Sequence, residues 1–210
     1  QQVLGEFGQG TFKFDPADED IHMAIEARLF EVVGDVAGKM HTARSRNDQV
    51  ALDVRMYLRD ELDALRMELR TLRRTLVDIG ELNSSVVMPG YTHLQQAQPV
   101  LFAHHMLAYF EMLSRDDQRL ADCRTRVNVL PLGSGALAGV PYPIDRAQVA
   151  AELGFAAVSA NSMDAVADRD FVAEFLFCCS LIMMHISRLS EELILWSSAE
   201  FGFVTIGEGF

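Results

Sequence analysis

A leucine repeat in the first half of the chain constrains its fold more than any other feature. From position 58 to position 79 the apolar residues are spaced alternately four and three apart, and Arg, Glu and Asp fill most positions between them. This heptad spacing predicts one long helix, from Asn47 to about Leu82, that packs against other helices. At ~1.5 Å per residue, such a helix is on the order of 50 Å long. The seam consists of Leu58, Leu62, Leu65, Leu69, Leu72, Leu76 and Ile79.

A second seam predicts another long helix, from about Asp164 to Ala199. Its members are Val172, Phe175, Cys179, Ile182, Ile186, Leu189, Leu193 and Trp196. A looser helix is expected from Pro99 to about Asn128, with Pro99 in the first turn, where a missing N–H is tolerated. Since no strand of consequence is expected, the sequence predicts an all-α fold, a long-helix bundle.

Shorter elements surround the long helices. An acidic first turn precedes a helix from Ile21 to Val33 that ends at Gly34, and another helix is expected from Asp145 to Leu153. The segment from Leu130 to Pro143 is rich in Gly and Pro and reads as irregular.

The two seams need more cover than three helices supply. Each seam Leu or Ile contributes roughly 1.5–3 kcal/mol when fully buried, and flanking residues such as Phe177, Met183 and Met184 are apolar too. We therefore expect partner helices from further chain or from other subunits.

Composition limits the possible partners and the compartment. The formal net charge of −12 argues against nucleic acid or an anionic membrane, since either needs a basic face. The longest mostly apolar run, Phe175 to Met184, is too short to span a bilayer. The three cysteines, two of them adjacent at Cys178 and Cys179, fit buried thiols in a reducing compartment. We expect a cytoplasmic protein.

One polar stretch stands out against this background, from Gly38 to Gln49. Ser45 followed by Asp48 predicts a helix start, where free N–H groups and the helix dipole favour an anion. Arg44 and Arg46 add planar donor forks suited to carboxylate or phosphate. A solvated turn with a good N-cap is the alternative.

Two further stretches carry candidate chemistry. His93 follows Thr92 in a connector before a helix, and His suits acid–base work near neutral pH. The Gly133-Ser-Gly135 turn lacks the Lys-Ser/Thr and the preceding strand of a phosphate loop, so we reject that interpretation. No Cys/His spacing indicates a metal site.

The stretch His41 to Val50 (HTARSRNDQV) resembles the first signature segment of the argininosuccinate lyase family, within the fumarase/aspartase superfamily. Met88 to Pro99 (MPGYTHLQQAQP) resembles the second segment, and Pro131 to Gly139 resembles a conformational element near the site. The resemblance extends over essentially the whole chain from Gly5 onward. It implies that argininosuccinate is cleaved to arginine and fumarate, in arginine biosynthesis, without metal or organic cofactor.

The resemblance also assigns roles to individual residues. His93 would belong to the acid–base apparatus, and Thr92 would hydrogen-bond a substrate carboxylate. Because a proton next to a carboxylate is very weakly acidic, oriented donors must meet the developing charge. We expect Asn47, Arg46 and Thr92 to be these substrate-binding donors and His93 to be the catalytic residue. His22 is expected only near the site.

The resemblance further implies an arrangement of domains and subunits. Residues 1–43 would be the C-terminal part of an N-terminal domain, and residues 44–210 an incomplete central helical bundle. The family's Ser-bearing mobile loop would begin where the sequence stops, so we expect a partial chain that is inactive alone. The whole protein is expected to be a homotetramer with sites shared between subunits. The alternatives are a crystallin-like structural relative without activity and a sister lyase acting on adenylosuccinate or aspartate.

Overall fold

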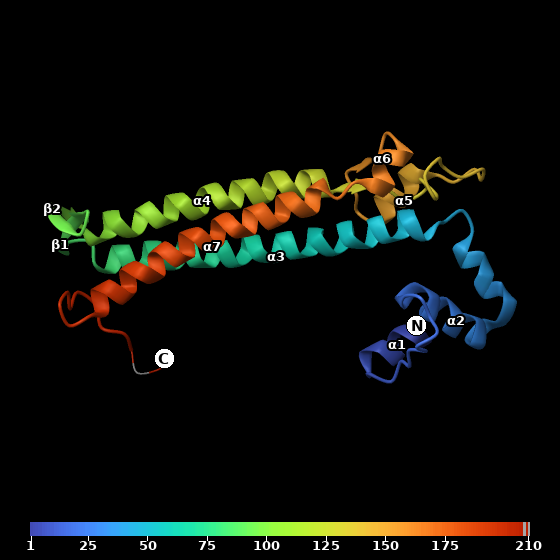
Figure 1. Ribbon diagram of the computed structural model, residues 1–210, viewed down its shortest axis with the longest axis horizontal. Coiled ribbons are helices and arrows are strands. Elements are labelled where there is room, and N and C mark those ends of the chain that lie inside the picture. The colour runs from blue at the N-terminus through green and yellow to red at the C-terminus, as the bar shows by residue number, and fades with distance from the viewer. Residues whose placement is uncertain (208, 210) are drawn as a thin grey trace.

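Three long helices form an elongated bundle in the computed structural model, which describes residues 1–207 and 209 (Figure 1). They are α3 (Arg46–Leu82), α4 (Phe102–Val127) and α7 (Asp170–Ser197). Helix α4 returns antiparallel to α3, and α7 runs in the same direction as α3 (Figure 1). The predicted bundle of long helices is confirmed.

Helix α3 begins within one residue of the predicted start. The Ser45 hydroxyl accepts from the Asn47 backbone N–H at 3.3 Å, and the Asp48 carboxylate accepts from the Ser45 N–H at 3.0 Å. This reciprocal capping satisfies donors that the first helical turn leaves unpaired. The helix ends at Leu82, as predicted, and Asn83 is its C-cap residue.

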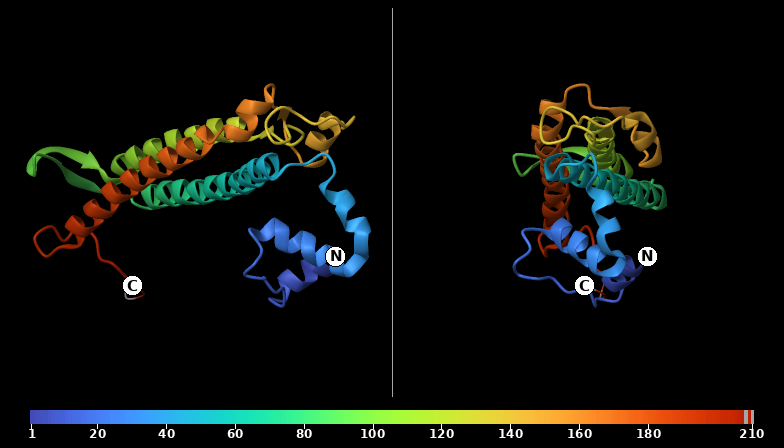
Figure 2. Two further views of the ribbon diagram at one scale, coloured as in Figure 1. Left: turned by 45° about the vertical axis from the view of Figure 1, so that its right-hand side comes forward. Right: turned by 90° about the vertical axis from the view of Figure 1, so that its right-hand side faces the viewer.

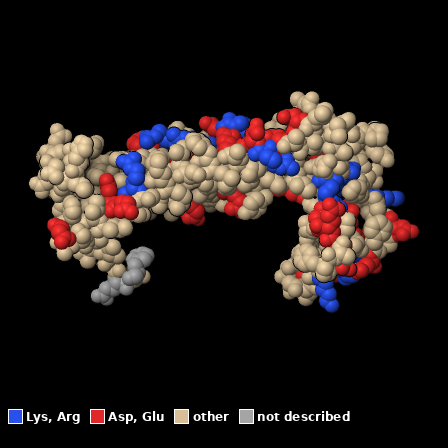
Figure 3. Space-filling view, in the orientation of Figure 1, with Lys and Arg blue, Asp and Glu red and all other residues tan. Residues whose placement is uncertain are grey.

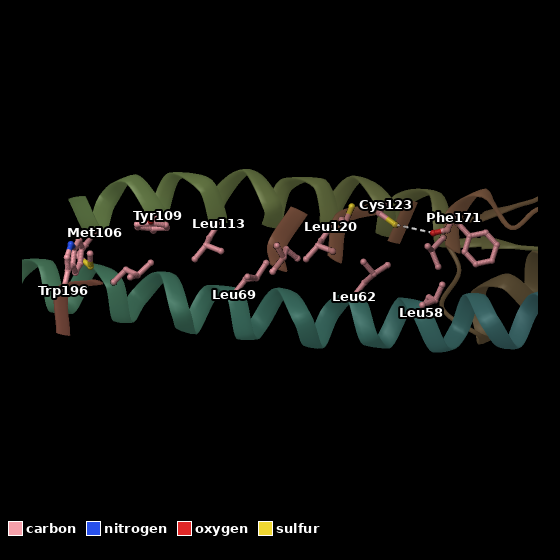
Figure 4. Packing of buried hydrophobic residues seen from close by; sticks show 14 of the residues in the cluster. Leu58, Leu62, Leu69, Met106, Tyr109, Leu113, Leu120, Cys123, Phe171 and Trp196 are labelled. Carbon is pink, nitrogen blue, oxygen red and sulfur yellow. Dashed lines mark hydrogen bonds between the residues drawn. The ribbon is translucent and has the colours of Figure 1, made fainter. Parts of the chain in front are cut away.

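The core lies between the three long helices (Figure 4). Leu62 on α3 and Leu120 on α4 are both 0% exposed. Helix α7 contributes Ile182 and Trp196 to the same hydrophobic core. The predicted α3 seam is buried at four of its seven positions, Leu58, Leu62, Leu69 and Leu76. The α3 seam therefore packs into the core, as its spacing predicts, but its last member, Ile79, remains 38% exposed.

Helix α7 begins six residues later than predicted, because a separate short helix, α6 (Ser162–Ala167), precedes it. The chain leaves the helical conformation at Asp168, where ψ is 127°. The buried Arg55 guanidinium contacts the Asp168 carboxylate at 2.5 Å and also donates to the Arg126 and Val127 carbonyls. This long-range ion pair stabilises the break between α6 and α7. Local helix propensity does not predict such a contact.

The prediction of no consequential strand is wrong at the far end of the bundle. Strands β1 (Val87–Thr92) and β2 (Gln95–Leu101) pair antiparallel, with Thr92 opposite Gln95 and Pro89 opposite Pro99. Pro99 therefore lies in a strand and not in the first turn of α4, which begins at Phe102. Pro has no backbone N–H, so a strand with a solvent-facing edge tolerates it where no donor to the partner strand is needed. Figure 2 shows the hairpin projecting beyond the ends of α3 and α4.

The remaining elements lie near the start of α3. Helix α5 (Arg146–Glu152) begins at the predicted cap, where Asp145 accepts from the Gln148 N–H at 2.9 Å. The two-residue strands β3 (Val129–Leu130) and β4 (Ala157–Val158) pair in parallel beside it. Helix α1 (Gln2–Gly8), helix α2 (Ile21–Val33) and the 3₁₀ helix η1 (Gly34–His41) lie below that end of the bundle (Figure 1). The predicted Ile21–Val33 helix is confirmed, whereas the proposed domain boundary near position 43 stays a prediction.

A large apolar surface remains on α7. Figure 3 shows charged side chains gathered along the upper edge of the bundle and around α1 and α2, whereas the α7 surface in this view is largely uncharged. Its exposed apolar residues are Leu176, Phe177, Met183, Met184, Leu193, Ile194 and Leu195. By length and composition alone, α7 is long and apolar enough to cross a membrane. This differs from the expectation drawn from the shorter apolar run Phe175 to Met184. Core helices of globular proteins also reach this length and apolar content. This surface agrees with the expectation that the bundle needs further helices.

Candidate functional site

Two of the predicted substrate-binding residues lie together in the first turn of α3, and we call Arg46 and Asn47 the α3 patch. The Asn47 side chain is exposed, and its Nδ2 donates to the Ala136 carbonyl at 3.1 Å. The carboxamide oxygen of Asn47 is not used by that bond, so it can contact a ligand. The contact fixes the orientation of Asn47 against the loop between β3 and α5.

Arg46 is less free than the sequence suggested, because acidic side chains surround its guanidinium. Its Nε lies 3.2 Å from Asp20, and its Nη1 lies 3.3 Å from Glu26 and 2.7 Å from Gln49 Oε1. Burial of Glu26 acts to raise its pKa, but hydrogen bonds from His41 and Arg46 outweigh burial and hold that pKa below its usual value. Two of the three guanidinium nitrogens of Arg46 are therefore already engaged by partners within the chain.

His22 belongs to the same network and was expected only near the site. Its Nε2 lies 3.0 Å from Asp53, and its Nδ1 lies 3.0 Å from Gln49 Nε2. Because an amide nitrogen can only donate, Nδ1 is the acceptor and Nε2 carries the proton toward Asp53. Gln49 thus links His22 to Arg46. Burial raises the pKa of Asp53, an effect that His22 opposes.

Sequence reasoning missed a further connection, made by Asp48. This residue is 0% exposed, and its Oδ2 accepts from the backbone N–H groups of Gly133 at 3.0 Å and Gly135 at 2.8 Å. The glycine turn therefore does form an anion-binding nest, and the chain's own carboxylate occupies it. Only Asp48's role as an N-terminal cap was visible in the local sequence.

The other predicted residues, Thr92 and His93, form the hairpin tip between β1 and β2. Both side chains are exposed. His93 and Leu94 are the two turn residues, with φ of 53° and 59°. Left-handed conformations at both positions suit the twist of a two-residue hairpin, but they normally call for Gly or Asn. Such backbone strain, typically about 1–3 kcal/mol per residue, concentrates at functional sites.

The α3 patch and the hairpin tip lie at opposite ends of the bundle, as Figures 1 and 2 show. Helix α3 alone has 37 residues, which at ~1.5 Å per residue separates its ends by roughly 55 Å. Within one chain, Asn47 and His93 therefore cannot contact the same small molecule. The structure brings Arg46 and Asn47 together and Thr92 and His93 together, but it does not bring the two pairs together.

A family model described as lyase matches residues 1–208. The chain belongs to this lyase family. The family lies within the fumarase/aspartase superfamily. Among curated proteins, the lyase-family chain is 60% identical over 208 residues to a protein named argininosuccinate lyase from Desulforudis audaxviator, covering 99% of this chain and 45% of that protein.

A second relative of the same name, from Syntrophotalea carbinolica, is 58% identical over 210 residues, covering all of this chain and 46% of that protein. Among solved structures, an EDDS lyase variant with bound fumarate superposes with a TM-score of 0.85 at 33% identity, covering 96% of this chain and 39% of that one. This lyase-family chain thus spans slightly less than half the length of the curated relatives it matches.

Two properties of the lyase-family chain bear on its chemistry. Within residues 1–207 and 209, no group of three or more His, Cys, Asp and Glu side chains is arranged to hold a metal. A hollow of about 350 Å³ lies along the hairpin, lined by Val87–Pro89 and Gln96–Pro99, but Thr92 and His93 do not line it. Thr92 and His93 therefore lie on the open surface of the hairpin tip, outside this hollow.

Proposed function

We propose that the whole protein containing this chain cleaves argininosuccinate to arginine and fumarate. The observation that carries the proposal is the 58–60% identity, over 99–100% of the chain, to proteins named argininosuccinate lyase. The fumarate bound in the EDDS lyase variant supports a four-carbon dicarboxylate product. The same identities disfavour a crystallin-like relative without activity and a sister lyase.

In this reaction His93 transfers a proton and the donors stabilise charge. Removal of the proton next to a carboxylate moves negative charge onto that carboxylate, where fixed donors lower the barrier. Asn47 and Thr92 supply neutral donors, and Arg46 supplies a positive charge near the α3 N-terminus, whose dipole also favours an anion. The C–N bond to the guanidinium group then breaks with the help of an acid.

The proposed site is shared between subunits. The α3 patch and the hairpin tip are roughly 55 Å apart in one chain, given α3's 37 residues, so a second copy must supply one of them. The exposed apolar surface of α7 supports association. We propose a cytoplasmic homotetramer, in which antiparallel neighbours bring one chain's Asn47 close to another chain's His93.

Fumarate absorbance during argininosuccinate turnover by the complete protein tests this function. His93→Asn should lower turnover by about 10²–10⁴-fold, as loss of general acid–base catalysis does. Thermal unfolding should be nearly unchanged, because His93 is exposed. A loss of less than about tenfold contradicts the role of His93, and turnover of adenylosuccinate or aspartate in preference to argininosuccinate contradicts the substrate.

A further inference from the structure

We propose that Asp48 is a positioning residue for Asn47, acting through the glycine loop Pro131–Gly139. The inference rests on the proposed function, because it takes Asn47 as a substrate-binding residue. Asp48 and Asn47 are neighbours in the first turn of α3, and both reach this loop, which follows more than eighty residues later in the chain. The loop therefore connects a buried carboxylate to an exposed carboxamide.

The Asp48 carboxylate fixes two backbones to one another. Its Oδ1 accepts from the Ser45 N–H at 3.0 Å, and its Oδ2 accepts from the N–H groups of Gly133 and Gly135. With 0% exposure, Asp48 has no water to replace any of these bonds if one is lost. The start of α3 and the glycine loop are thus held as one unit.

The loop itself has little freedom to adjust. Ser134 is buried, its hydroxyl donates to the Pro131 carbonyl at 2.6 Å, and its own carbonyl accepts from the Gly139 N–H at 2.7 Å. At Gly135, where φ is 62°, an added Cβ would lie 2.6 Å from the Gly139 carbonyl oxygen. This closely approached backbone determines where the carbonyl of the next residue, Ala136, points.

That Ala136 carbonyl is the group that orients Asn47. The Nδ2 of Asn47 donates to it at 3.1 Å, which leaves one N–H and the carboxamide oxygen for a ligand. An exposed amide without this contact would sample several rotamers. Because oriented donors stabilise a transition state far better than mobile ones, a rigid loop under Asn47 increases its effect on catalysis.

Asp48→Asn in the complete enzyme tests the inference. The substitution keeps the shape but replaces one acceptor oxygen with an NH₂ group that cannot accept from a backbone N–H. We expect kcat/KM for argininosuccinate to fall by about ten- to a hundredfold, mainly in kcat, as small misplacements of a positioned group do. The matched control is Asp60→Asn on the same helix, where the side chain is 79% exposed and kcat/KM should not change.

A double-mutant cycle with Asn47→Ala separates positioning from general damage. If Asp48 acts through Asn47, adding Asp48→Asn to Asn47→Ala should change kcat/KM by less than about threefold. A merely structural role lowers activity by the same factor in both backgrounds. Additive losses across the cycle overturn the inference, and so does an Asp48→Asn variant with unchanged kcat/KM.

If the Asp48→Asn variant does not fold, Gly139→Ala replaces it in the double-mutant cycle with Asn47→Ala. Gly139 has φ of 85° and nothing within 4 Å of an added Cβ, so alanine there strains the loop backbone without touching Asp48 or Asn47. We expect a severalfold loss of kcat/KM in the parent enzyme and almost none in the Asn47→Ala background. Equal losses in both backgrounds overturn the inference. An Asn47→Ala enzyme with parental activity removes Asn47 from the proposed site, which is a separate failure.

Discussion

Mixing two inactive variants of the complete protein should restore activity, because Asn47 and His93 lie at opposite ends of the bundle. The 37 residues of α3 separate the two ends by roughly 55 Å. If every site takes Asn47 from one subunit and His93 from another, subunits that carry Asn47→Ala and subunits that carry His93→Asn can complement each other. Each variant alone should be nearly inactive.

The expected recovery follows from random assembly. In an equal mixture, half of the Asn47 positions and half of the His93 positions are intact, so about a quarter of the sites contain both. Mixing the double variant with the parent protein is the matched control. Shared sites predict about a quarter again, whereas sites within one chain predict half for the control and none for the two single variants.

The two proteins should be co-expressed with different tags, isolated as mixed oligomers and assayed as fumarate release from argininosuccinate. Both mixtures should reach similar activities, near a quarter of the parental value. Zero recovery from the single variants together with half activity in the control would falsify the shared-site reasoning. The comparison depends on the ratio between the two mixtures and not on absolute rates.

Three further predictions concern the bundle itself. Leu120→Ala should lower the free energy of unfolding by about 2–5 kcal/mol, because the side chain is 0% exposed in the three-helix core, and a shift below about 1 kcal/mol in urea unfolding contradicts that packing. Burial acts to raise the pKa of Asp117, but hydrogen bonds from Arg66 and Arg73 outweigh burial and hold that pKa below its usual 3.8. The resulting stabilisation is present above that value and is lost as pH falls through the lower native pKa, so Asp117→Asn should weaken the acid dependence of unfolding and remove about 1 kcal/mol at neutral pH. Burial raises the pKa of the Cys123 thiol to about 12, so a thiol reagent at pH 8 should label it only after denaturation, and fast labelling of the folded protein counts against the packing.

The long helices could be predicted because their signals are local and repeated. The heptad spacing is visible in the residues around Leu62, and the capping pair Ser45 and Asp48 is only three residues apart. The structure contains both the buried seam and the cap. The late start of α7 could not be predicted in the same way, because it depends on Arg55 reaching Asp168, more than a hundred residues away.

The hairpin was missed for a different reason. Its strands contain Pro89 and Pro99, and three of the seven β2 residues are glutamines, so the sequence of neither is typical of a strand. The turn at His93 and Leu94 lacks the Asn-Gly signature of a two-residue hairpin. Pairing between the strands supplies the order that each strand lacks on its own.

The membership of the candidate site stays a prediction, and the structure adds how its residues are placed within one chain. The resemblance named Arg46, Asn47, Thr92 and His93, and the structure divides them into two pairs at opposite ends of the bundle. The acidic partners of Arg46 come from α2 and the preceding turn, and the second function of Asp48 comes from a loop far along the chain. These contacts arise from tertiary packing, which one sequence does not display.

The length of α3 imposes a constraint that its composition does not. Under the proposed sharing of sites, the helix works as a spacer, since the distance from its first turn to the hairpin must match that in a neighbouring copy. Deleting one heptad from each long helix of one copy would keep its remaining core residues in phase, yet it would move its Asn47 about 10 Å out of alignment with His93 of a full-length neighbour. Substitutions along the bundle leave this match unchanged, whereas a change of length in one copy alone disturbs it.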